Sequence, residues 1–454
     1  MTTINKYIFR GYDIRGVYPK DLNADVAYII GQSFGTYVKQ MGKVECIVGR
    51  DNRYSSLELE TALIKGILST GIDVIDLGLV TTPMYYYACI LKKIPTGIMV
   101  TASHNPKDDN GFKFAFDERG NARGEMIEEF RDFTLKGEFS KGIGKLSKYD
   151  IRDEYIKLML SSIKLGKKPL KVILDLGNGT TTCIAKDIYY RFPIDIEVLF
   201  GESDPSFPNH HPDPCVESNL EALKKKVLDT KADIGIAFDG DGDRVGIIDE
   251  KGNYIPTDKY MIIIIRDIIN KVSNKKFLYD IKCSKAVDDE IKKLGGESIC
   301  YRTGNSYTKA KVKEDDLPFG GELSGHVYFR DRWPGFDSGI YAGLRLVEIL
   351  SNTDKPLSHL LDGITHYEST PELKFASPDE KKFAVIDKIK NYCIQKGYNV
   401  LTIDGVRVNF EDGWASVRAS NTGPNITARF EATTNERLKE IQDEFVGLVE
   451  TFNK

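Results

Sequence analysis

The sequence predicts an α/β protein with three related α/β domains built on mixed sheets, followed by a smaller C-terminal α+β domain. The first observation is a repeat: short apolar, β-branched runs end on acidic residues at Asp51, Asp175 and Asp280, a pattern typical of buried parallel strands. The second is that each run leads into helical patterning and then into another apolar run that breaks into a polar loop, in GIMVTASHNP, IGIAFDGDGDR and LPFGGELSGH. This order predicts one architecture used three times.

The end of the chain has a different pattern. STPELKF resembles a linker, residues 406–421 alternate as antiparallel strands do, and a long helical pattern comes last. The apolar face of that helix is formed by Leu438, Ile441, Phe445, Leu448 and Phe452. We therefore expect a fourth domain, with domain boundaries at 1–150, 151–253, 254–367 and 368–454.

A helix is also predicted over residues 55–70. Ser55 and Glu58 form a capping-box pattern at its start. Apolar residues recur every fourth position, at Leu59, Leu63 and Ile67.

The polar loops define where we expect the site. In open α/β sheets, ligands bind beyond the carboxyl ends of the strands, where loops supply polar groups on a rigid frame. If the domains face one another, their loops converge on a central interdomain cleft. We expect the active site there.

Composition excludes several classes of protein. With 454 residues and 41% hydrophobic content, the chain can bury several cores, and its seven cysteines without a CxxC pair are expected to be reduced thiols. The 63 basic and 67 acidic residues give a net charge of −4 without a basic stripe, so no nucleic-acid partner is expected. The longest apolar run stops after Ile265 and the N-terminus lacks a secretion signal, so we expect no membrane partner and a cytoplasmic location.

The acidic loop DGDGDR predicts a cation site. Asp239, Asp241 and Asp243 come after a predicted strand, and alternate residues of an extended segment point the same way. Oxygen ligands select a hard ion such as Mg²⁺ or Ca²⁺. An EF-hand would use Glu250 as its last ligand, but Arg244 stands where that loop needs glycine, and VGIID predicts a strand. A solvated acidic turn is the alternative without a ligand.

The motif TASHNP places Ser103 and His104 just past a strand, where the next two residues, an Asn-Pro pair, force a turn. A serine in such a turn is most often a local hydrogen-bonding residue. Near a divalent ion, the same hydroxyl is suited to carry a phosphoryl group.

The third loop, GELSGH, offers Glu322, Ser324 and His326. Glu322 and Ser324 have the acceptor and donor groups that suit sugar hydroxyls, and His326 can move a proton near neutral pH. A structural histidine is the alternative.

The last loop, in RASNTGPNITARFE, predicts a phosphate clamp. Arginine offers forked donors that match phosphate, and a tight turn adds hydroxyl and backbone N–H groups. The alternative is a hairpin loop with a surface pair between Arg429 and Glu431. The clamp residues are Arg418, Ser420, Asn421, Thr422 and Arg429.

His210 and His211, in FPNHHPDP, are weaker candidates for metal ligands. Two adjacent imidazoles without further nitrogen or sulfur ligands at a recognisable spacing are not typical of zinc sites. We interpret this segment as a rigid, proline-rich loop.

Taken together, TASHNP, DGDGDR, GELSGH and RASNTGP resemble the α-D-phosphohexomutase superfamily, most closely its bacterial-type phosphomannomutase/phosphoglucomutase branch. FRGYDIRG, NGFK, FPNHHPDP and GHVYFRDRWPGFDSG also match that branch, and the match spans almost the whole chain. The resemblance implies four domains. It also implies reversible interconversion of hexose 1-phosphate and hexose 6-phosphate, of mannose or glucose, through a phosphoserine and a hexose 1,6-bisphosphate such as glucose 1,6-bisphosphate.

The resemblance further implies roles for matching residues. The ligands of Mg²⁺ would be the phosphorylated Ser103 with Asp239, Asp241 and Asp243. Proton handling or electrostatic help would come from Lys113, His326 and Arg15. Substrate binding would fall to Tyr12, Arg244, Lys282, Glu322, Ser324, His326, Arg418, Ser420, Asn421, Thr422 and Arg429.

One position departs from the branch, because Asn305 stands where relatives often have histidine. This departure bears on substrate preference or on contacts with the distal phosphate.

Within the class, the alternative is a phosphoglucosamine mutase, although that branch looks more like DGDADR and GEQSGH. A non-catalytic sugar-phosphate or Ca²⁺-binding module is the alternative from another class. The expected partners are small sugar phosphates, and we expect a monomer or weak homo-oligomer.

Overall fold

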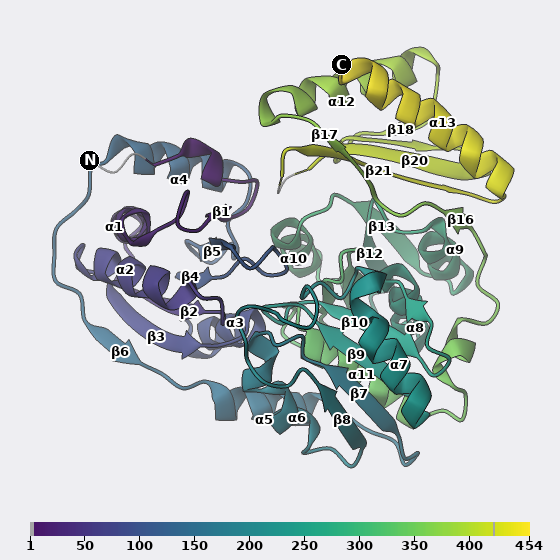
Figure 1. Ribbon diagram of the computed structural model, residues 1–454, viewed down its shortest axis with the longest axis horizontal. Helices are drawn as coiled ribbons and strands as arrows, with labels where there is room; N and C mark the ends of the chain where they lie inside the picture. The colour runs from purple at the N-terminus through teal and green to yellow at the C-terminus, as the bar shows by residue number, and fades with distance from the viewer. Residues whose placement is uncertain (1–3, 421–422) are drawn as a thin grey trace. The chain divides into compact units, whose positions relative to one another are not determined.

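The computed structural model describes residues 4–420 and 423–454 (Figure 1). The chain divides into two compact units. The first unit consists of Met1–Tyr260 and Ser324–Leu360, and the second of Met261–Leu323 and Leu361–Lys454.

The first sheet of the first unit has six strands in the order β1-β5-β4-β2-β3-β6. The central strands are parallel, whereas β5 runs antiparallel to β4 and β1, so the sheet is mixed. Its strands are β1 (Ile14–Val17), β2 (Glu45–Arg50), β3 (Asp73–Leu79), β4 (Gly97–Val100), β5 (Asp109–Ala115) and β6 (Leu146–Lys148). The helices of this part are α1 (Ala24–Gln40), α2 (Ser56–Leu68), α3 (Thr82–Lys92) and α4 (Glu125–Lys136).

Helices α1 and α2 lie against one another in close contact (Figure 1). A Cβ atom on Gly31 would lie 2.2 Å from the carbonyl oxygen of Leu63, and one on Gly66 would lie 2.2 Å from that of Tyr28. Glycine is therefore required on both sides of this helix pair.

The capping box expected at the start of α2 is wrong. Ser55 has a helical backbone conformation and makes no side-chain cap. Its Oγ instead accepts a hydrogen bond from Asn110 Nδ2 at 2.7 Å, while Glu58 accepts one from the Tyr18 hydroxyl at 2.9 Å. Both side chains are thus used in contacts distant in sequence, which a local pattern does not reveal.

The second sheet of the first unit has five strands in the order β11-β10-β9-β7-β8. Strands β7, β8 and β9 are parallel, and β10 is antiparallel to β9 and to β11. The strands are β7 (Lys171–Asp175), β8 (Asp195–Leu199), β9 (Ile234–Phe238), β10 (Val245–Asp249) and β11 (Tyr254–Ile255). The first unit also contains α5 (Arg152–Ser162), α6 (Ala185–Tyr189), α7 (Glu221–Thr230), β15 (Val327–Phe329) and α11 (Gly339–Ser351).

The second unit begins with the parallel strands β12 (Lys276–Asp280), β13 (Glu297–Tyr301) and β14 (Phe319–Gly321), with β12 between the other two. The helices beside them are α9 (Lys285–Lys293) and α10 (Asn305–Glu314), while α8 (Thr257–Ile268) spans the boundary between the units.

The predicted repeat is confirmed in all three α/β parts. In each part the strand of the first apolar run pairs in parallel with the strand of the second, β2 with β4, β7 with β9 and β12 with β14. The acidic residue at the end of each first strand accepts a backbone N–H from two residues further on, which belongs to Arg53, Gly177 and Lys282. The aspartates therefore shape the turn after each strand.

The C-terminal sheet is antiparallel, in the order β16-β21-β20-β19-β18, with β17 also paired to β21. Helices α12 (Asp379–Gln395) and α13 (Asn435–Phe452) cover one face of this sheet (Figure 1), and Ile441, Phe445 and Val449 of α13 are buried. The strands are β16 (Glu368–Ser369), β17 (Leu373–Ala376), β18 (Val400–Leu401), β19 (Val406–Asn409), β20 (Gly413–Ala419) and β21 (Asn425–Ala432). The interpretation of STPELKF as a linker is therefore incomplete, because this segment pairs with β21.

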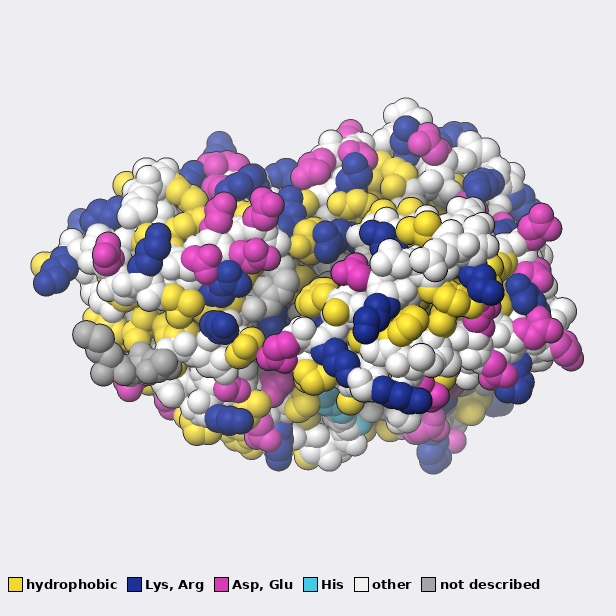
Figure 2. All heavy atoms as spheres, turned by 90° about the horizontal axis from the view of Figure 1, so that it is seen from above, with side chains coloured by type: hydrophobic (Ala, Val, Ile, Leu, Met, Phe, Trp, Pro, Cys, Tyr) yellow, Lys and Arg dark blue, Asp and Glu magenta, His cyan; other side chains and the backbone are white. Residues whose placement is uncertain are grey.

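The surface charges are mixed and the cysteines are unpaired, as the composition of the chain suggests. On the face drawn in Figure 2, Lys and Arg side chains are interspersed with Asp and Glu. All seven cysteines are free thiols. Among the described residues, no helix combines the length and the apolar character needed to cross a bilayer. The domain boundaries expected from the sequence stay predictions.

Candidate active site

The DGDGDR loop gathers three buried carboxylates at the end of β9. Oxygen atoms of Asp239, Asp241 and Asp243 lie within 4.8 Å of one another. They are not brought together by an extended segment, as the spacing predicts, but by a turn in which Gly242 has a φ of 80° and its N–H donates to Asp239. The left-handed conformation of glycine makes this turn possible. The predicted strand VGIID is β10, and a turn and β11 follow it. An EF-hand is therefore excluded, because its second helix would have to stand directly after the loop.

The serine loop lies directly against this turn. Ser103 Oγ donates a hydrogen bond to Asp239 Oδ2 at 2.7 Å, and the backbone N–H of Ser103 donates to Thr101 Oγ1 at 2.9 Å. Ser103 has a φ of 52°, an uncommon conformation for a residue with a side chain. A Cβ atom on Gly240 would lie 2.5 Å from the Ser103 carbonyl oxygen, so the two loops need glycine at their contact.

Arg53 holds the serine loop, and no sequence pattern identifies it. Its guanidinium donates to four backbone carbonyls, those of Ser103 and Asn105 through Nη2 and those of Pro106 and Asp109 through Nη1. Nε lies 3.2 Å from a carboxylate oxygen of Asp51, and Arg53 is only 3% exposed. One buried side chain therefore fixes the path of the loop from residue 103 to residue 109.

Lys113 compensates the charge of the aspartates. Its Nζ lies 2.8 Å from Asp241 Oδ2 and 2.7 Å from Asp243 Oδ2. Burial lowers the pKa of Lys113, but the two carboxylates more than offset this and raise it well above its usual range. Burial likewise raises the pKa values of Asp241 and Asp243, and Lys113 brings both below their ordinary value. The pKa of Asp239 is raised well above the usual range by burial and by the other two aspartates.

These residues fit a hard divalent cation. Asp241 Oδ1 and Asp243 Oδ1 are buried and have no hydrogen-bond donor among the described residues. The third carboxylate, Asp239, is costly to ionise without a further positive charge, as its raised pKa indicates. Three buried carboxylates with open oxygen atoms form the donor set that Mg²⁺ or Ca²⁺ prefers.

Further cations lie around the cluster. Arg15 Nε lies 2.8 Å from Asp13 Oδ2. Burial lowers the pKa of Arg15, but the attraction of Asp13, Tyr12 and Asp241 more than offsets this and raises it. Arg244 Nε lies 3.8 Å from Asp239 Oδ2, and its backbone N–H donates to Oδ1 of the same residue at 3.1 Å. The structure therefore places Arg244 against Asp239, Arg15 within electrostatic reach of Asp241, and Tyr12 beside Arg15.

His104 lies next to the serine as a neutral ring. Its Nδ1 is 3.4 Å from Ser103 Oγ. Burial, together with repulsion from Arg244 and Arg15, lowers the pKa of His104 well below its usual range.

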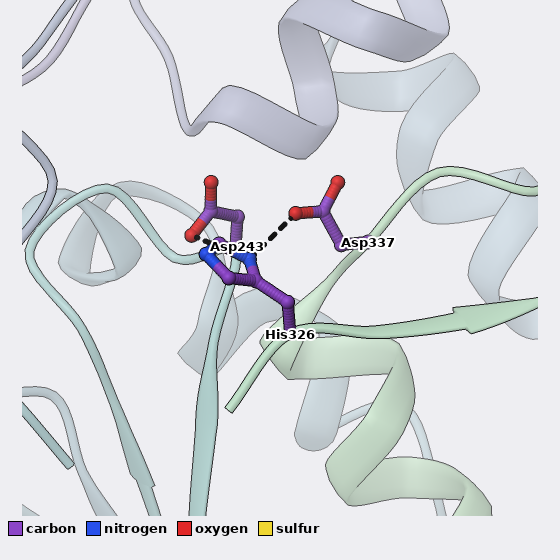
Figure 3. A group of neighbouring side chains, drawn as sticks. All are labelled: Asp243, His326 and Asp337. Atoms are coloured by element: carbon purple, nitrogen blue, oxygen red, sulfur yellow. Dashed lines mark hydrogen bonds and ion pairs between the residues drawn. The ribbon is translucent and has the colours of Figure 1, made fainter. Parts of the chain in front are cut away.

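His326 reaches the cluster from the segment before β15 (Figure 3). Its Nδ1 lies 2.8 Å from Asp337 Oδ2 and 3.5 Å from Asp243 Oδ1. Asp337, which belongs to the segment GHVYFRDRWPGFDSG but was given no role from the sequence, therefore orients the imidazole. With Nδ1–H donated to Asp337, the neutral imidazole carries its acceptor lone pair on Nε2.

The GELSGH loop crosses the boundary between the units. Ser324 is half-buried and belongs with His326 to the first unit, whereas Glu322 belongs to the second. Glu322 Oε1 accepts hydrogen bonds from Thr308 Oγ1 at 2.6 Å and from the backbone N–H of Gly304 at 3.2 Å. Asn305 is buried at the start of α10, directly after Gly304.

The predicted phosphate clamp lies in the second unit. Lys282 Nζ forms an ion pair with Glu372 Oε2 at 3.0 Å, and Arg418 Nε donates to Asp404 Oδ2 at 2.8 Å. Arg429 Nη1 donates to the carbonyl oxygen of Lys282.

Ser420 Oγ accepts the N–H of Gly423 at 3.2 Å, while Asn421 and Thr422 lie outside the described residues. The alternative partner of Arg429, Glu431, accepts hydrogen bonds from Trp414 Nε1 and the N–H of Lys285.

The structure also adds residues that sequence reasoning missed. Thr82 and Thr101 donate to Asp241 Oδ2 at 2.6 and 3.1 Å. Thr101 stands within TASHNP, so its place in the motif could have revealed it. His210 is not part of this cluster: its Nε2 lies 3.1 Å from Asp175 and its Nδ1 lies 2.9 Å from the carbonyl oxygen of His211, which agrees with a structural role.

The chain matches the models of a known protein family. Four family models match the chain in order, and their descriptions are phosphoglucomutase/phosphomannomutase, alpha/beta/alpha domains I, II and III, and the C-terminal domain. The matched residues are 6–141, 153–252, 256–367 and 372–448. The chain belongs to the phosphoglucomutase/phosphomannomutase family, and the predicted fold class is confirmed.

Individual relatives are similar to this chain over nearly its whole length. The chain is 41% identical to a phosphomannomutase/phosphoglucomutase of Pseudomonas putida, covering 96% of this chain and 94% of the relative. It is 39% identical to a phosphoglucomutase of Neisseria meningitidis, covering 99% and 98%. A crystal structure of a phosphoglucomutase/phosphomannomutase family protein from Burkholderia thailandensis superposes with a TM-score of 0.91 at 39% identity, covering 99% of this chain and 98% of that one.

Proposed function

We propose that this protein interconverts hexose 1-phosphate and hexose 6-phosphate, of mannose or glucose, through a phosphorylated Ser103. The observation that carries the proposal is the 2.7 Å contact between Ser103 Oγ and Asp239 within the buried carboxylate cluster. A hydroxyl beside a divalent cation is suited to phosphoryl transfer. The relatives named phosphomannomutase/phosphoglucomutase support the same reaction.

In the first half-reaction a sugar hydroxyl oxygen attacks the phosphorus of phospho-Ser103. The bond between phosphorus and Ser103 Oγ breaks as the new bond to the sugar oxygen forms, giving a hexose 1,6-bisphosphate. The bisphosphate then turns end for end, and in the second half-reaction Ser103 Oγ attacks the phosphorus of its other phosphoryl group. The bond from that phosphorus to the sugar oxygen breaks, which regenerates phospho-Ser103 and releases the isomeric hexose monophosphate. A Mg²⁺ ion held by the three aspartates would neutralise charge on the phosphoryl oxygens.

Protons are handled by residues around the serine. His326 Nε2 takes the proton of the attacking hydroxyl, because Nδ1 is engaged with Asp337 at 2.8 Å. Lys113 carries a firmly held proton and contacts two of the aspartates in the cluster that Ser103 meets through Asp239, so it stabilises the departing oxygen or protonates it. Arg15 adds positive charge on the same side.

The remaining predicted residues bind the substrate. We propose that Tyr12 and Arg244 contact the sugar phosphate near the reacting end and that Glu322 and Ser324 bind sugar hydroxyls. The non-reacting phosphate would be held by Lys282, Arg418, Ser420, Asn421, Thr422 and Arg429. Water must be kept away from phospho-Ser103 during the reaction, because water that reaches it would hydrolyse it. We further propose a cytoplasmic monomer or weak homo-oligomer.

Intact-mass measurement tests this proposal. After incubation with glucose 1,6-bisphosphate and Mg²⁺, the wild-type chain should gain the mass of one phosphoryl group on Ser103. Ser103→Ala should gain none and should lose conversion of mannose 1-phosphate and glucose 1-phosphate by at least about a thousandfold. Ser161→Ala is a matched control, since Ser161 is exposed and its hydroxyl donates to the Leu158 carbonyl at 2.9 Å.

Two outcomes would count against the proposal. If Ser103→Ala kept full conversion, the serine would not be the carrier. If the wild-type chain gained no phosphate and converted no hexose phosphate, a non-catalytic binding module would be the better interpretation. Comparing turnover of mannose 6-phosphate with that of glucosamine 6-phosphate separates the proposed activity from that of a phosphoglucosamine mutase.

A further inference from the structure

Arg418 of the phosphate clamp is paired with a carboxylate of the protein, and so is Lys282, which joins the clamp because its carbonyl oxygen accepts a hydrogen bond from Arg429. Lys282 Nζ lies 3.0 Å from Glu372 Oε2, and Arg418 Nε lies 2.8 Å from Asp404 Oδ2. All four residues belong to the second unit. A phosphate that enters the clamp therefore meets the carboxylates of Glu372 and Asp404. Either it binds beside both of them, or it displaces one of them from its cation.

The two carboxylates are held differently. Asp404 is fixed, because its Oδ2 also accepts the backbone N–H of Thr303 at 3.1 Å, and its side chain is 8% exposed. Glu372 stands in the short connection between β16 and β17, and its side chain is 27% exposed, although Oε2, the oxygen that faces Lys282, is itself buried. The carboxylate of Glu372 can thus swing into solvent at a smaller cost than that of Asp404.

Glu372 also lies where a phosphate would be attracted. Burial raises the pKa of Glu372, but Lys282 more than offsets this and lowers it, with further help from Arg418 and Lys374. Glu372 is therefore an anion that experiences the field of two clamp residues. Asp280 adds to the same balance, since it raises the pKa of Lys282 together with Glu372 against the lowering effect of burial.

We propose that Glu372 is a displaceable internal anion that occupies the clamp when it is empty and gives way to the non-reacting phosphate of the substrate. This inference rests on the proposed function, because it assigns the clamp to substrate phosphate. Asp404, in contrast, is a positioning residue that keeps the Arg418 guanidinium oriented.

The displaceable anion has a consequence for the bisphosphate. A mutase must release the distal phosphate during each cycle, because the same clamp binds first one phosphate and then the other. Competition from Glu372 weakens the clamp and favours that release. The charge of Glu372 also keeps Lys282 neutralised between cycles, so that a buried ammonium group is never unpaired.

Two variants with opposite expected effects test the inference in the full chain. In Glu372→Gln the competing charge is removed at nearly constant volume, and inorganic phosphate and glucose 6-phosphate should bind about five to ten times more tightly by calorimetry. In Asp404→Asn the orientation of Arg418 is weakened, and both probes should bind more weakly. Glu368→Gln is the matched control for net charge, since Glu368 lies in the same segment but pairs with His366 at 3.0 Å.

Turnover provides a second readout. Glu372→Gln should hold the bisphosphate intermediate longer in the clamp, so that kcat and KM both fall. If Glu372→Gln is too unstable to measure, Glu372→Asp keeps the charge but withdraws it from Lys282, and it should bind phosphate more tightly than wild type by a smaller factor.

The outcomes are distinguishable. Binding by Glu372→Gln that is no tighter than binding by Glu368→Gln overturns the inference, and weaker binding would mean that Glu372 orients Lys282. Tighter binding by Asp404→Asn would overturn the contrast between the two carboxylates. If the wild-type chain bound no glucose 6-phosphate and gained no phosphate on Ser103, the proposed function itself would fail.

Discussion

The serine loop and the phosphate clamp are held in opposite ways. Ser103 lies in a loop whose backbone is bound at four carbonyls by the buried Arg53 and whose side chain meets Asp239. Lys282 of the clamp is held by the partly exposed Glu372, which stands in a connecting segment. The difference corresponds to two tasks. Bond making requires atoms fixed in place, whereas a clamp that accepts two phosphates in turn must exchange its partner.

Among the variants that test this comparison, the largest effect is expected from loosening the fixed region. Arg53→Lys replaces a planar fork with a point charge that cannot reach four carbonyls and Asp51 at once. We expect kcat to fall by about a hundredfold, with KM changed by less than about threefold, because Ser103 moves relative to Asp239. Steady-state kinetics and the rate of Ser103 phosphorylation by glucose 1,6-bisphosphate measure this.

Arg50→Lys is the matched control for Arg53→Lys. Arg50 stands at the end of β2, and its Nε lies 3.0 Å from Glu60 Oε2. Its replacement should leave turnover nearly unchanged. A normal phosphorylation rate in Arg53→Lys would show that the serine loop keeps its shape without the guanidinium.

An intermediate effect on turnover is expected when the orientation of His326 is weakened. Asp337→Asn keeps the shape but removes the charge that orients His326, so we expect kcat to fall by about tenfold with little change in KM. Asp337→Glu restores the carboxylate and should recover part of the loss. Equal losses in both variants, or a change confined to KM, would contradict an orienting role.

The smallest effect concerns stability rather than turnover. Burial lowers the pKa of His210, but Asp175 and the carbonyl of His211 more than offset this and raise it. The charged imidazole therefore stabilises the fold fully below the unfolded-state pKa of about 6.5, and this contribution is lost as the pH rises through the folded-state pKa. His210→Gln should lower the free energy of unfolding by about 1 kcal/mol at pH 6 and by less at pH 9.

Urea unfolding at the two pH values measures this difference. Turnover of His210→Gln should stay near the wild-type value, because the serine loop is held by Arg53. His366→Gln is a suitable control, since His366 also pairs with a carboxylate but its side chain is 81% exposed. A pH-independent loss in His210→Gln would mean that the ring acts by packing and not by charge.

The sequence predicts those parts of the fold that depend on local patterns. The apolar runs before Asp51, Asp175 and Asp280 are strands, and the acidic loop after β9 gathers its carboxylates. These features are visible locally, because strand periodicity and glycine-rich turns are written within a few residues.

The remaining features depend on distant segments. Ser55 does not cap its helix because Asn110, far along the chain, occupies its hydroxyl. Arg53 has no recognisable pattern because its partners are backbone carbonyls, which every residue type possesses. Glu372 is hidden in a segment that resembles a linker, and the pairing of that segment with β21 only appears once the C-terminal sheet is folded. Contacts of this kind have no signature in composition or spacing.

The grip of Arg53 on main-chain oxygen atoms has an evolutionary consequence. Beyond the Asn-Pro pair and the hydrogen bond from Asn105 Nδ2 to Asp109 Oδ2, the route of the polypeptide there does not depend on side chains, so the exposed Lys107 and Asp108 are open to replacement without disturbing the nucleophile. Lineages of this enzyme can therefore retune what the serine encounters by altering its neighbours in sequence, provided that one guanidinium group is inherited unchanged.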